Sequence, residues 1–117
     1  MSPEVKIDSV RSESSGTLGR ALNKGHGATL TLDSSSRPQP DAFTNSEAFL
    51  AGVSSCGVTL IEMHAKETGV PLARMAVTID GSRDPAVPRY QSVHMRFEMA
   101  GVSQAQAEDL VKTYRSR

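Results

Sequence analysis

The segment Thr44–Gly69, TNSEAFLAGVSSCGVTLIEMHAKETG, places the only cysteine of the chain inside a long, nearly uncharged run with helical character. Between Ala48 and Met63 the one charged residue is Glu62. A helix that is apolar on most sides is buried rather than amphipathic. We therefore expect a buried central helix against which the rest of the chain folds.

The ends of this helix are marked in the sequence. Thr44-Asn45-Ser46-Glu47 fits the capping box, in which the first and fourth residues satisfy each other's backbone amides. Gly69 is expected to end the helix, and Pro71 prevents its continuation. Gly52 and Gly57 lie inside it, although each glycine costs a helix about 1 kcal/mol relative to alanine. Two such residues predict that another element packs very close to the helix.

Length and composition limit the architecture. With 117 residues the chain is expected to form one domain, residues 1–117. Aromatic residues make up 4% and tryptophan is absent, so the core must consist mainly of Val, Leu, Ile, Met and Ala. Such a thin core favours further burial between subunits.

Charge and cysteine content exclude several classes of function. Thirteen basic and thirteen acidic residues cancel, which argues against a nucleic acid or an anionic membrane as partner. The longest uncharged run, Ala48–Ile61, is too short to cross a bilayer, and the first ten residues lack the apolar stretch of a signal peptide. A single cysteine excludes an internal disulfide and favours a cytoplasmic location.

Metal-binding patterns are absent from the sequence. The three histidines are scattered, and there is no HExxH or CxxC spacing. We expect neither a metal nor an organic cofactor.

Strand patterns precede the helix. Val5 and Ile7 alternate with polar residues toward Arg11, which predicts a half-buried strand. A second strand is expected over 18–23, a tight turn at 24–27 and a third strand over 28–33. Three short strands joined by turns predict an antiparallel meander, followed by a loop over 34–42.

Two further strands and a second helix follow the central helix. Alternating apolar residues predict strands within 72–82 and 90–100, with a loop between them. Ser103-Gln104-Ala105-Gln106 forms a second capping box, and the helix after it is expected to continue to Arg117. The order β-β-β-α-β-β-α indicates an α+β fold in which an antiparallel sheet wraps around the central helix.

Three stretches of the chain resemble the OsmC/Ohr family of osmotically inducible and organic hydroperoxide resistance proteins. They are SEAFLAGVSSCGVTL in the central helix, HAKETGVPLARMAVTIDGSRD after it and RYQSVHMRFEMAGVSQAQAEDLVKTYRSR at the end. Together they place the resemblance over roughly the whole chain, with residues 5–33 matching only as a strand pattern.

The resemblance implies an intertwined homodimer and a peroxide-reducing thiol near its interface. Cys56 stands at the position of the family's peroxidatic cysteine, which an organic hydroperoxide oxidises to a sulfenic acid. Peroxidase members also use an arginine from the first hairpin, for which Arg11 and Arg20 are candidates and Arg20 is preferred. They use a glutamate near the helix start, one position before Glu47, where this chain has Ser46. Glu47 matches the glutamate of the broader OsmC-like members.

The family's second, resolving cysteine would be expected just beyond Arg117. We therefore expect either that a resolving cysteine and a last strand lie outside this sequence, or that the protein is a one-cysteine variant. In the second case an external thiol must act as reductant.

Two interpretations of Cys56 stay open. A cysteine in a buried helix is commonly a small apolar packing residue, and burial opposes thiolate formation. Activation would need a nearby cation or hydrogen-bond donors, such as an arginine from the first hairpin or from a partner chain. The sequence therefore predicts either thiol-dependent reduction of organic hydroperoxides or a non-catalytic stress protein that binds a small apolar ligand, with Cys56 as packing. For Glu47 the alternative to a catalytic role is helix capping.

Overall fold

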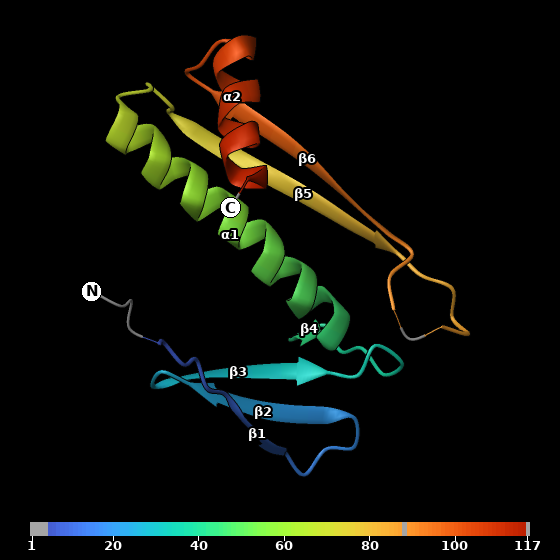
Figure 1. Cartoon of the computed structure of the whole chain (residues 1–117). Coiled ribbons are helices and arrows are strands. Elements are labelled where there is room, and N and C mark those ends of the chain that lie inside the picture. The colour runs from blue at the N-terminus through green and yellow to red at the C-terminus, as the bar shows by residue number, and fades with distance from the viewer. Residues whose placement is uncertain (1–4, 88, 117) are drawn as a thin grey trace. The chain divides into compact units, whose positions relative to one another are not determined.

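The computed structural model describes residues 5–87 and 89–116 and divides the chain into two compact units, residues 1–48 and 49–117. The elements, in chain order (Figure 1), are β1 (Arg11–Ser14), β2 (Arg20–Gly25), β3 (Ala28–Asp33), β4 (Phe43–Thr44), α1 (Asn45–Thr68), β5 (Arg74–Ser82), β6 (Ser92–Ala100) and α2 (Gln104–Arg115). The α+β class and the expected order are confirmed, with the short strand β4 added. That the 117 residues form one domain stays a prediction.

The first unit is built on the expected meander. β1, β2 and β3 pair antiparallel in sequence order, and β4 joins β3 in parallel. Between β2 and β3, His26 and Gly27 have φ angles of 53° and 80°. Two successive positive φ angles define the type I′ turn that matches the twist of a hairpin. This turn fixes the register in which Arg20 faces Asp33 across the two strands.

The first strand was predicted at the wrong place. Residues 5–10 have no regular structure, and Val5 and Ile7 are 88% and 82% exposed. The strand begins at Arg11, where Arg11 pairs with Lys24 of β2. Alternation alone predicted a strand over residues 5–10, but a strand also needs a neighbouring strand to pair with. In the described part of this unit, the pairing with β2 begins only at Arg11.

The second unit contains the hairpin of β5 and β6. Their antiparallel register runs from Arg74 opposite Ala100 to Ser82 opposite Ser92. One face of β5 is half-buried and the other exposed, as the sequence alternation predicted. The four-stranded sheet and this hairpin are separate sheets, whereas one antiparallel sheet was expected.

A small core holds the second unit together. Its buried residues are Ile61 and Ala65 of α1 and Leu110 of α2. Half-buried apolar residues from the hairpin, α2 and the segment after α1 pack against them, namely Val70, Leu72, Met75, Phe97, Met99 and Tyr114. Most of these residues are aliphatic or methionine, as the composition predicted, and Phe97 and Tyr114 contribute two rings whose centroids lie 5.9 Å apart.

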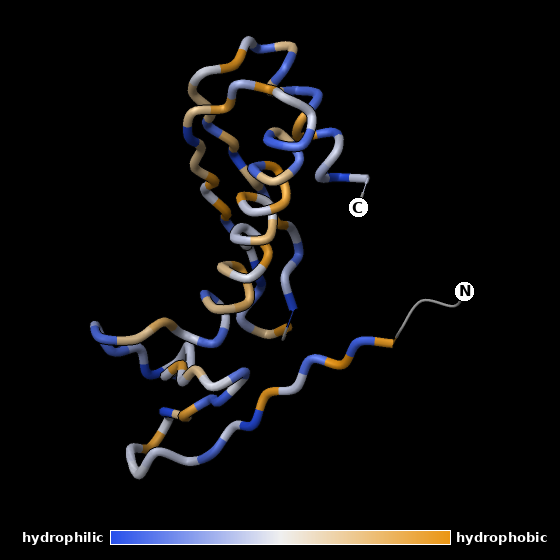
Figure 2. The backbone as a smooth tube through the Cα atoms, turned by 90° about the vertical axis from the view of Figure 1, so that its left-hand side faces the viewer, coloured by the Kyte–Doolittle hydropathy of each residue, from blue (hydrophilic) through white to orange (hydrophobic). Residues whose placement is uncertain are grey.

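α1 is less buried than its composition indicated. Figure 2 shows a largely white and orange tube along most of the helix, yet its buried residues are only Gly57, Ile61 and Ala65. They recur every four positions and therefore share one face. Phe49 and Met63 on other faces are each 59% exposed. In the described part of this unit, the other elements therefore cover only one stripe of α1.

The predicted helix ends are largely confirmed. In the capping box of α1 the Thr44 amide donates to Glu47 Oε1 at 2.9 Å, and the Glu47 amide donates to Thr44 Oγ1 at 3.2 Å. Gly69 follows with a φ of 72°. Ser103 and Gln106 form the second box at α2. That helix ends at Arg115 and is capped by Ser116, so the expectation that it continues to Arg117 was wrong.

One helix of the described residues passes a simple test for a membrane span. By length and composition α1 is long and apolar enough to cross a membrane, whereas its uncharged run alone is too short. This is weak evidence, because the core helix of a soluble protein passes the same test.

Candidate functional site

Cys56 lies in the middle of α1 and is exposed, contrary to the expected burial. Its Sγ atom has no hydrogen-bond partner in the part of the chain that the structure describes. Its carbonyl oxygen accepts a hydrogen bond from Thr59 Oγ1 at 3.3 Å. Exposure makes the thiol accessible to a reagent or substrate, which packing inside the unit would prevent.

Gly57, the next residue along α1, is packed against α2. A Cβ atom added at Gly57 would lie 3.4 Å from the ring of Tyr114. The Tyr114 hydroxyl donates to the Val53 carbonyl at 3.3 Å. This contact explains Gly57 and confirms the close packing predicted there, whereas a Cβ at Gly52 would meet nothing within 4 Å.

Arg20, the preferred candidate cation, is held by two carboxylates of the first unit. Its Nε and Nη2 donate to Asp33 Oδ1 and Oδ2 at 2.7 and 3.0 Å. Its Nη2 and Nη1 donate to Asp41 Oδ1 and Oδ2 at 2.6 and 3.2 Å. Both pairs are bidentate, the geometry in which a guanidinium binds a carboxylate most strongly.

The cluster shifts the titration of all three groups. Hydrogen bonds from Arg20 lower the pKa of Asp33 and of Asp41, since they favour the ionised carboxylates. Bonds to Asp33 and then Asp41 raise the pKa of Arg20 further above its ordinary value. All three groups are therefore charged at neutral pH.

The two carboxylates that bind Arg20 were missed at the sequence level. A signal for Asp33 exists, because a two-residue turn at His26-Gly27 places Arg20 opposite Asp33. Opposite charges facing each other across a strand pair are favourable. No comparable signal marks Asp41, which lies in the irregular loop between β3 and β4.

Glu47 lies in the first turn of α1 and is exposed. One carboxylate oxygen is committed to the Thr44 amide, so the capping role is present in the structure. The other candidate arginine, Arg11, is 82% exposed and lies 3.6 Å from a carboxylate oxygen of Glu13. Arg20 and Glu47 belong to the first unit and Cys56 to the second, so their arrangement around one another stays a prediction.

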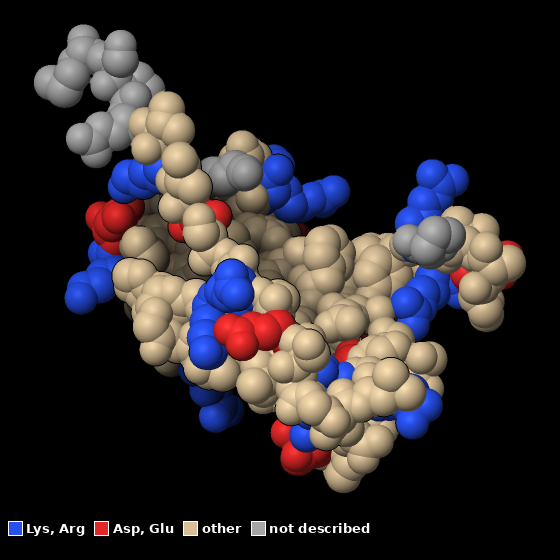
Figure 3. Space-filling model, turned by 90° about the horizontal axis from the view of Figure 1, so that it is seen from below, with Lys and Arg blue, Asp and Glu red and all other residues tan. Residues whose placement is uncertain are grey.

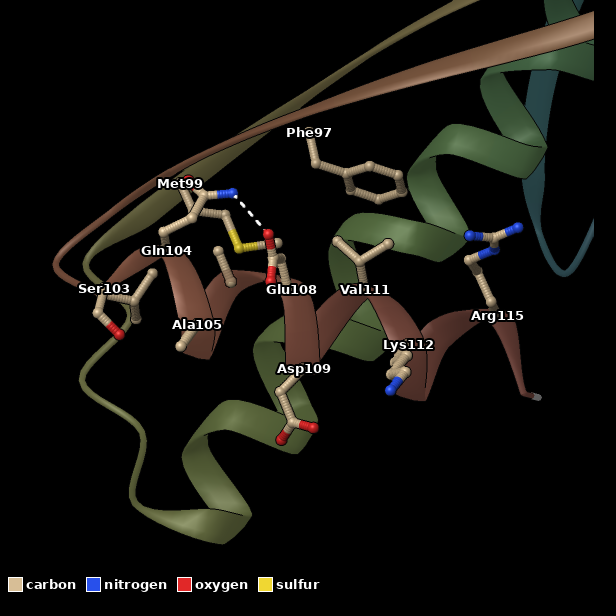
Figure 4. A pocket seen from close by; sticks show the side chains of 12 residues that line it. Phe97, Met99, Ser103, Gln104, Ala105, Glu108, Asp109, Val111, Lys112 and Arg115 are labelled. Carbon is tan, nitrogen blue, oxygen red and sulfur yellow. Dashed lines mark hydrogen bonds between the residues drawn. The ribbon is translucent and has the colours of Figure 1, made fainter.

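A groove of about 540 Å³ lies between β6 and α2. Figure 4 shows Phe97 and Met99 of β6 facing the helix, with Val111 beside them and a hydrogen bond between Gln104 and Glu108. Charged side chains of both signs line it together with these apolar groups, and Cys56 does not. The groove is therefore separate from the candidate thiol.

The charged side chains form no single-sign patch on the face drawn in Figure 3, where Lys and Arg are interspersed with Asp and Glu. No cluster of three or more metal-ligating side chains occurs among the described residues. The chemistry available at the surface therefore rests on the thiol and on individual ion pairs.

Several solved structures share this fold. An OsmC-like protein from Mycoplasma pneumoniae superposes with a TM-score of 0.84 at 15% identity, over 96% of this chain and 82% of its own. An organic hydroperoxide resistance protein OsmC from Legionella pneumophila gives 0.73 at 17% identity, over 97% and 85%. A putative organic hydroperoxide resistance protein from Vibrio cholerae gives 0.70 at 21% identity, over 97% and 81%. At such identities the likeness shows the fold alone.

Sequence comparison supplies the family. None of the curated proteins compared with this chain matches it. The family model of the OsmC-like proteins matches residues 38–117, which is more than half of the chain and includes all of α1. The resemblance found in the central helix and the two segments after it is thereby confirmed. The chain belongs to the OsmC-like protein family.

Proposed function

We propose that this protein reduces organic hydroperoxides with an external thiol as reductant, and that Cys56 is its peroxidatic cysteine. The observation that carries the proposal is the exposed position of the only cysteine on α1. The supporting context is the family, since structural neighbours of this chain include organic hydroperoxide resistance proteins. Its own unit leaves the thiol uncovered, so Cys56 is not a packing residue of that unit.

The proposed reaction begins with the thiolate. Cys56 Sγ attacks the distal oxygen of the hydroperoxide, so an S–O bond forms and the O–O bond breaks. The leaving alkoxide takes up a proton and departs as an alcohol. Sulfur is oxidised by two electrons to a sulfenic acid, and the peroxide is reduced by the same two electrons.

An external thiol completes the cycle. Its sulfur attacks the sulfenic sulfur, releasing water and leaving a mixed disulfide on Cys56. A second thiol then restores the Cys56 thiol and releases a disulfide. This route needs no second cysteine, and the given sequence contains one cysteine.

Arg20 and Glu47 are the proposed helpers of Cys56. A guanidinium beside the thiol would favour the thiolate and bind the peroxide oxygen. Glu47, with one oxygen committed to the helix cap, would orient that arginine through the other. These roles are what the family resemblance implies, and we propose that Arg20 and Glu47 assist Cys56 in catalysis.

We further propose that the protein acts as a homodimer in the cytoplasm. Proteins of the OsmC/Ohr family are soluble and generally dimeric. The uncovered side of α1, which carries Phe49, Cys56 and Met63, supplies apolar surface for a second copy.

Consumption of cumene hydroperoxide in the presence of a dithiol tests the function. We expect Cys56→Ser to reduce the rate to that of the dithiol alone, because the serine hydroxyl is not ionised at neutral pH. Ser55→Ala, a neighbouring exposed position on α1, is the matched control and should retain the rate of the unmodified protein. Equal rates in Cys56→Ser and the unmodified protein would contradict the proposal.

The second candidate function is non-catalytic binding of a small apolar ligand, and the engagement of Arg20 favours it. A guanidinium that already binds two carboxylates has little capacity left to activate a thiol. This alternative predicts no peroxidase activity and no reaction of Cys56 with iodoacetamide at neutral pH. Rapid alkylation of Cys56 would count against it.

A further inference from the structure

The two carboxylates that bind Arg20 differ sharply in burial. The side chain of Asp33 is 1% exposed and that of Asp41 is 69% exposed, while Arg20 is 19% exposed. Asp33 also accepts the Gln39 amide at 3.2 Å. One partner is therefore fixed inside the unit and the other is held only from the solvent side.

The hydrogen bonds leave little of the guanidinium unused. An arginine has five N–H groups, and four hydrogen bonds to Asp33 and Asp41 occupy Nε, both protons of Nη2 and one of Nη1. A thiolate or a peroxide oxygen that requires the outer edge of the guanidinium must therefore replace Asp41. Replacing Asp33 would instead leave a buried carboxylate without its cation, which is strongly unfavourable.

The backbone around Asp41 is suited to such an exchange. Asp41 lies in the irregular loop between β3 and β4, after Pro38 and Pro40. The start of this loop is tied to the sheet by the Ser34 amide, which donates to the Gly19 carbonyl at 2.8 Å. An ion pair with an exposed carboxylate is screened by water and contributes little to stability. The Arg20–Asp41 pair is thus the easier of the two to open.

We propose that Asp41 is a displaceable competitor for Arg20, and that Asp33 is the positioning residue that keeps the guanidinium in place when Asp41 leaves. The inference rests on the proposed function, because it concerns the availability of Arg20 to the Cys56 thiolate. While Asp41 is bound, Arg20 is inactive. When Asp41 leaves, the thiolate and the hydroperoxide bind Nη1 and Nη2 of Arg20 in its place.

The experiment compares Asp41→Asn with the unmodified protein in two assays. Asparagine keeps the size of the side chain but removes the charge that competes for Arg20. We expect the rate constant for alkylation of Cys56 by iodoacetamide at pH 7 to rise several-fold. We expect kcat/KM for cumene hydroperoxide to rise with it. Asp8→Asn, an exposed position in the segment before β1, is the matched control and should change neither value.

Two further variants connect the gain to Arg20. The gain should disappear in the double variant Arg20→Gln with Asp41→Asn, because no guanidinium is then released; circular dichroism must show this variant folded, since Arg20→Gln leaves the buried Asp33 without its cation. Asp33→Asn should lower the alkylation rate, provided that its circular dichroism spectrum shows a folded protein. Asp41→Asn needs no such check of folding, since the Asp41 side chain is largely exposed.

The outcomes separate this inference from the proposed function. An alkylation rate in Asp41→Asn equal to or below that of the unmodified protein overturns the inference, even if hydroperoxide consumption depends on Cys56. A several-fold gain that survives loss of Arg20 overturns it as well. Retention of full activity in Cys56→Ser overturns the proposed function instead, while the alkylation assay still decides whether Asp41 competes for Arg20.

Discussion

Asp33 and Asp41 make the stability of the first unit depend on acid pH. The pKa of each is lowered by hydrogen bonds from Arg20, so each carboxyl binds its proton more weakly in the folded than in the unfolded chain. Their contribution is complete above the unfolded pKa of about 3.9 and is lost as pH falls below it. We expect the melting temperature of Asp41→Asn to fall slightly less than that of the unmodified protein between about pH 5 and 3, the difference being small because Asp41 is 69% exposed. Asp8→Asn should follow the unmodified protein, and parallel curves for Asp41→Asn would contradict the assignment.

The same residues show the limit of sequence reasoning at this scale. Cys56 could be selected because it is the only cysteine and matches a family position. The partners of Arg20 lie 13 and 21 residues away, and the second depends on the path of an irregular loop. Local patterns carry no information about such a path, so a cation that was expected to be available is found engaged.

At the scale of elements, the capping box of α1 allows stability and catalysis to be separated. Thr44→Ala removes the oxygen that accepts the Glu47 amide and should cost about 1 kcal/mol of unfolding free energy. Glu47→Gln keeps an acceptor for the Thr44 amide, since glutamine also serves at this position of a capping box. Urea unfolding should therefore show a smaller loss for Glu47→Gln than for Thr44→Ala. If Glu47 acts beside Arg20, the glutamine variant should still lose peroxidase activity, and unchanged activity would leave it a capping residue.

The hairpin turn between β2 and β3 gives a second test at this scale. Gly27 has a φ of 80° and open space where a Cβ would lie, so Gly27→Ala is strained by backbone conformation alone. We expect it to destabilise the chain by about 1–2 kcal/mol in urea unfolding. His26→Asn should be neutral or stabilising, because asparagine tolerates the φ of 53° better. A neutral Gly27→Ala would show that the turn differs from the type I′ geometry.

Elements with local signals were predicted well and those without were not. The two capping boxes, the turn at Gly27 and the alternation of β5 and β6 each depend on a few neighbouring residues, and the structure contains all of them. β1 was misplaced because its position depends on pairing with β2. β4 was missed because a two-residue strand has no periodicity to detect.

At the scale of the whole molecule, α1 has more apolar surface than its own unit covers. Phe49, Gly52, Cys56, Thr59 and Met63 follow one another at three- and four-residue spacing and are all exposed, so they form a second stripe on the helix. The sequence predicted that α1 is buried. For this stripe the prediction holds only if a second copy of the chain covers it. Gly57 already has its close neighbour in Tyr114, whereas Gly52 has none within 4 Å.

Gly52 therefore distinguishes a monomer from the proposed dimer. In a single chain Gly52→Leu meets open space and replaces a poor helix former, so the monomer should remain folded. If a partner helix packs on the stripe, the larger side chain prevents its close approach. We expect light scattering after size exclusion to show a dimer for the unmodified protein and a monomer for Gly52→Leu, with circular dichroism unchanged. Asp109→Leu, at an exposed position of α2, is the control for added apolar surface and should remain dimeric. A dimer that persists in Gly52→Leu would place the interface elsewhere, and the exposure of Cys56 would then extend to the assembled protein.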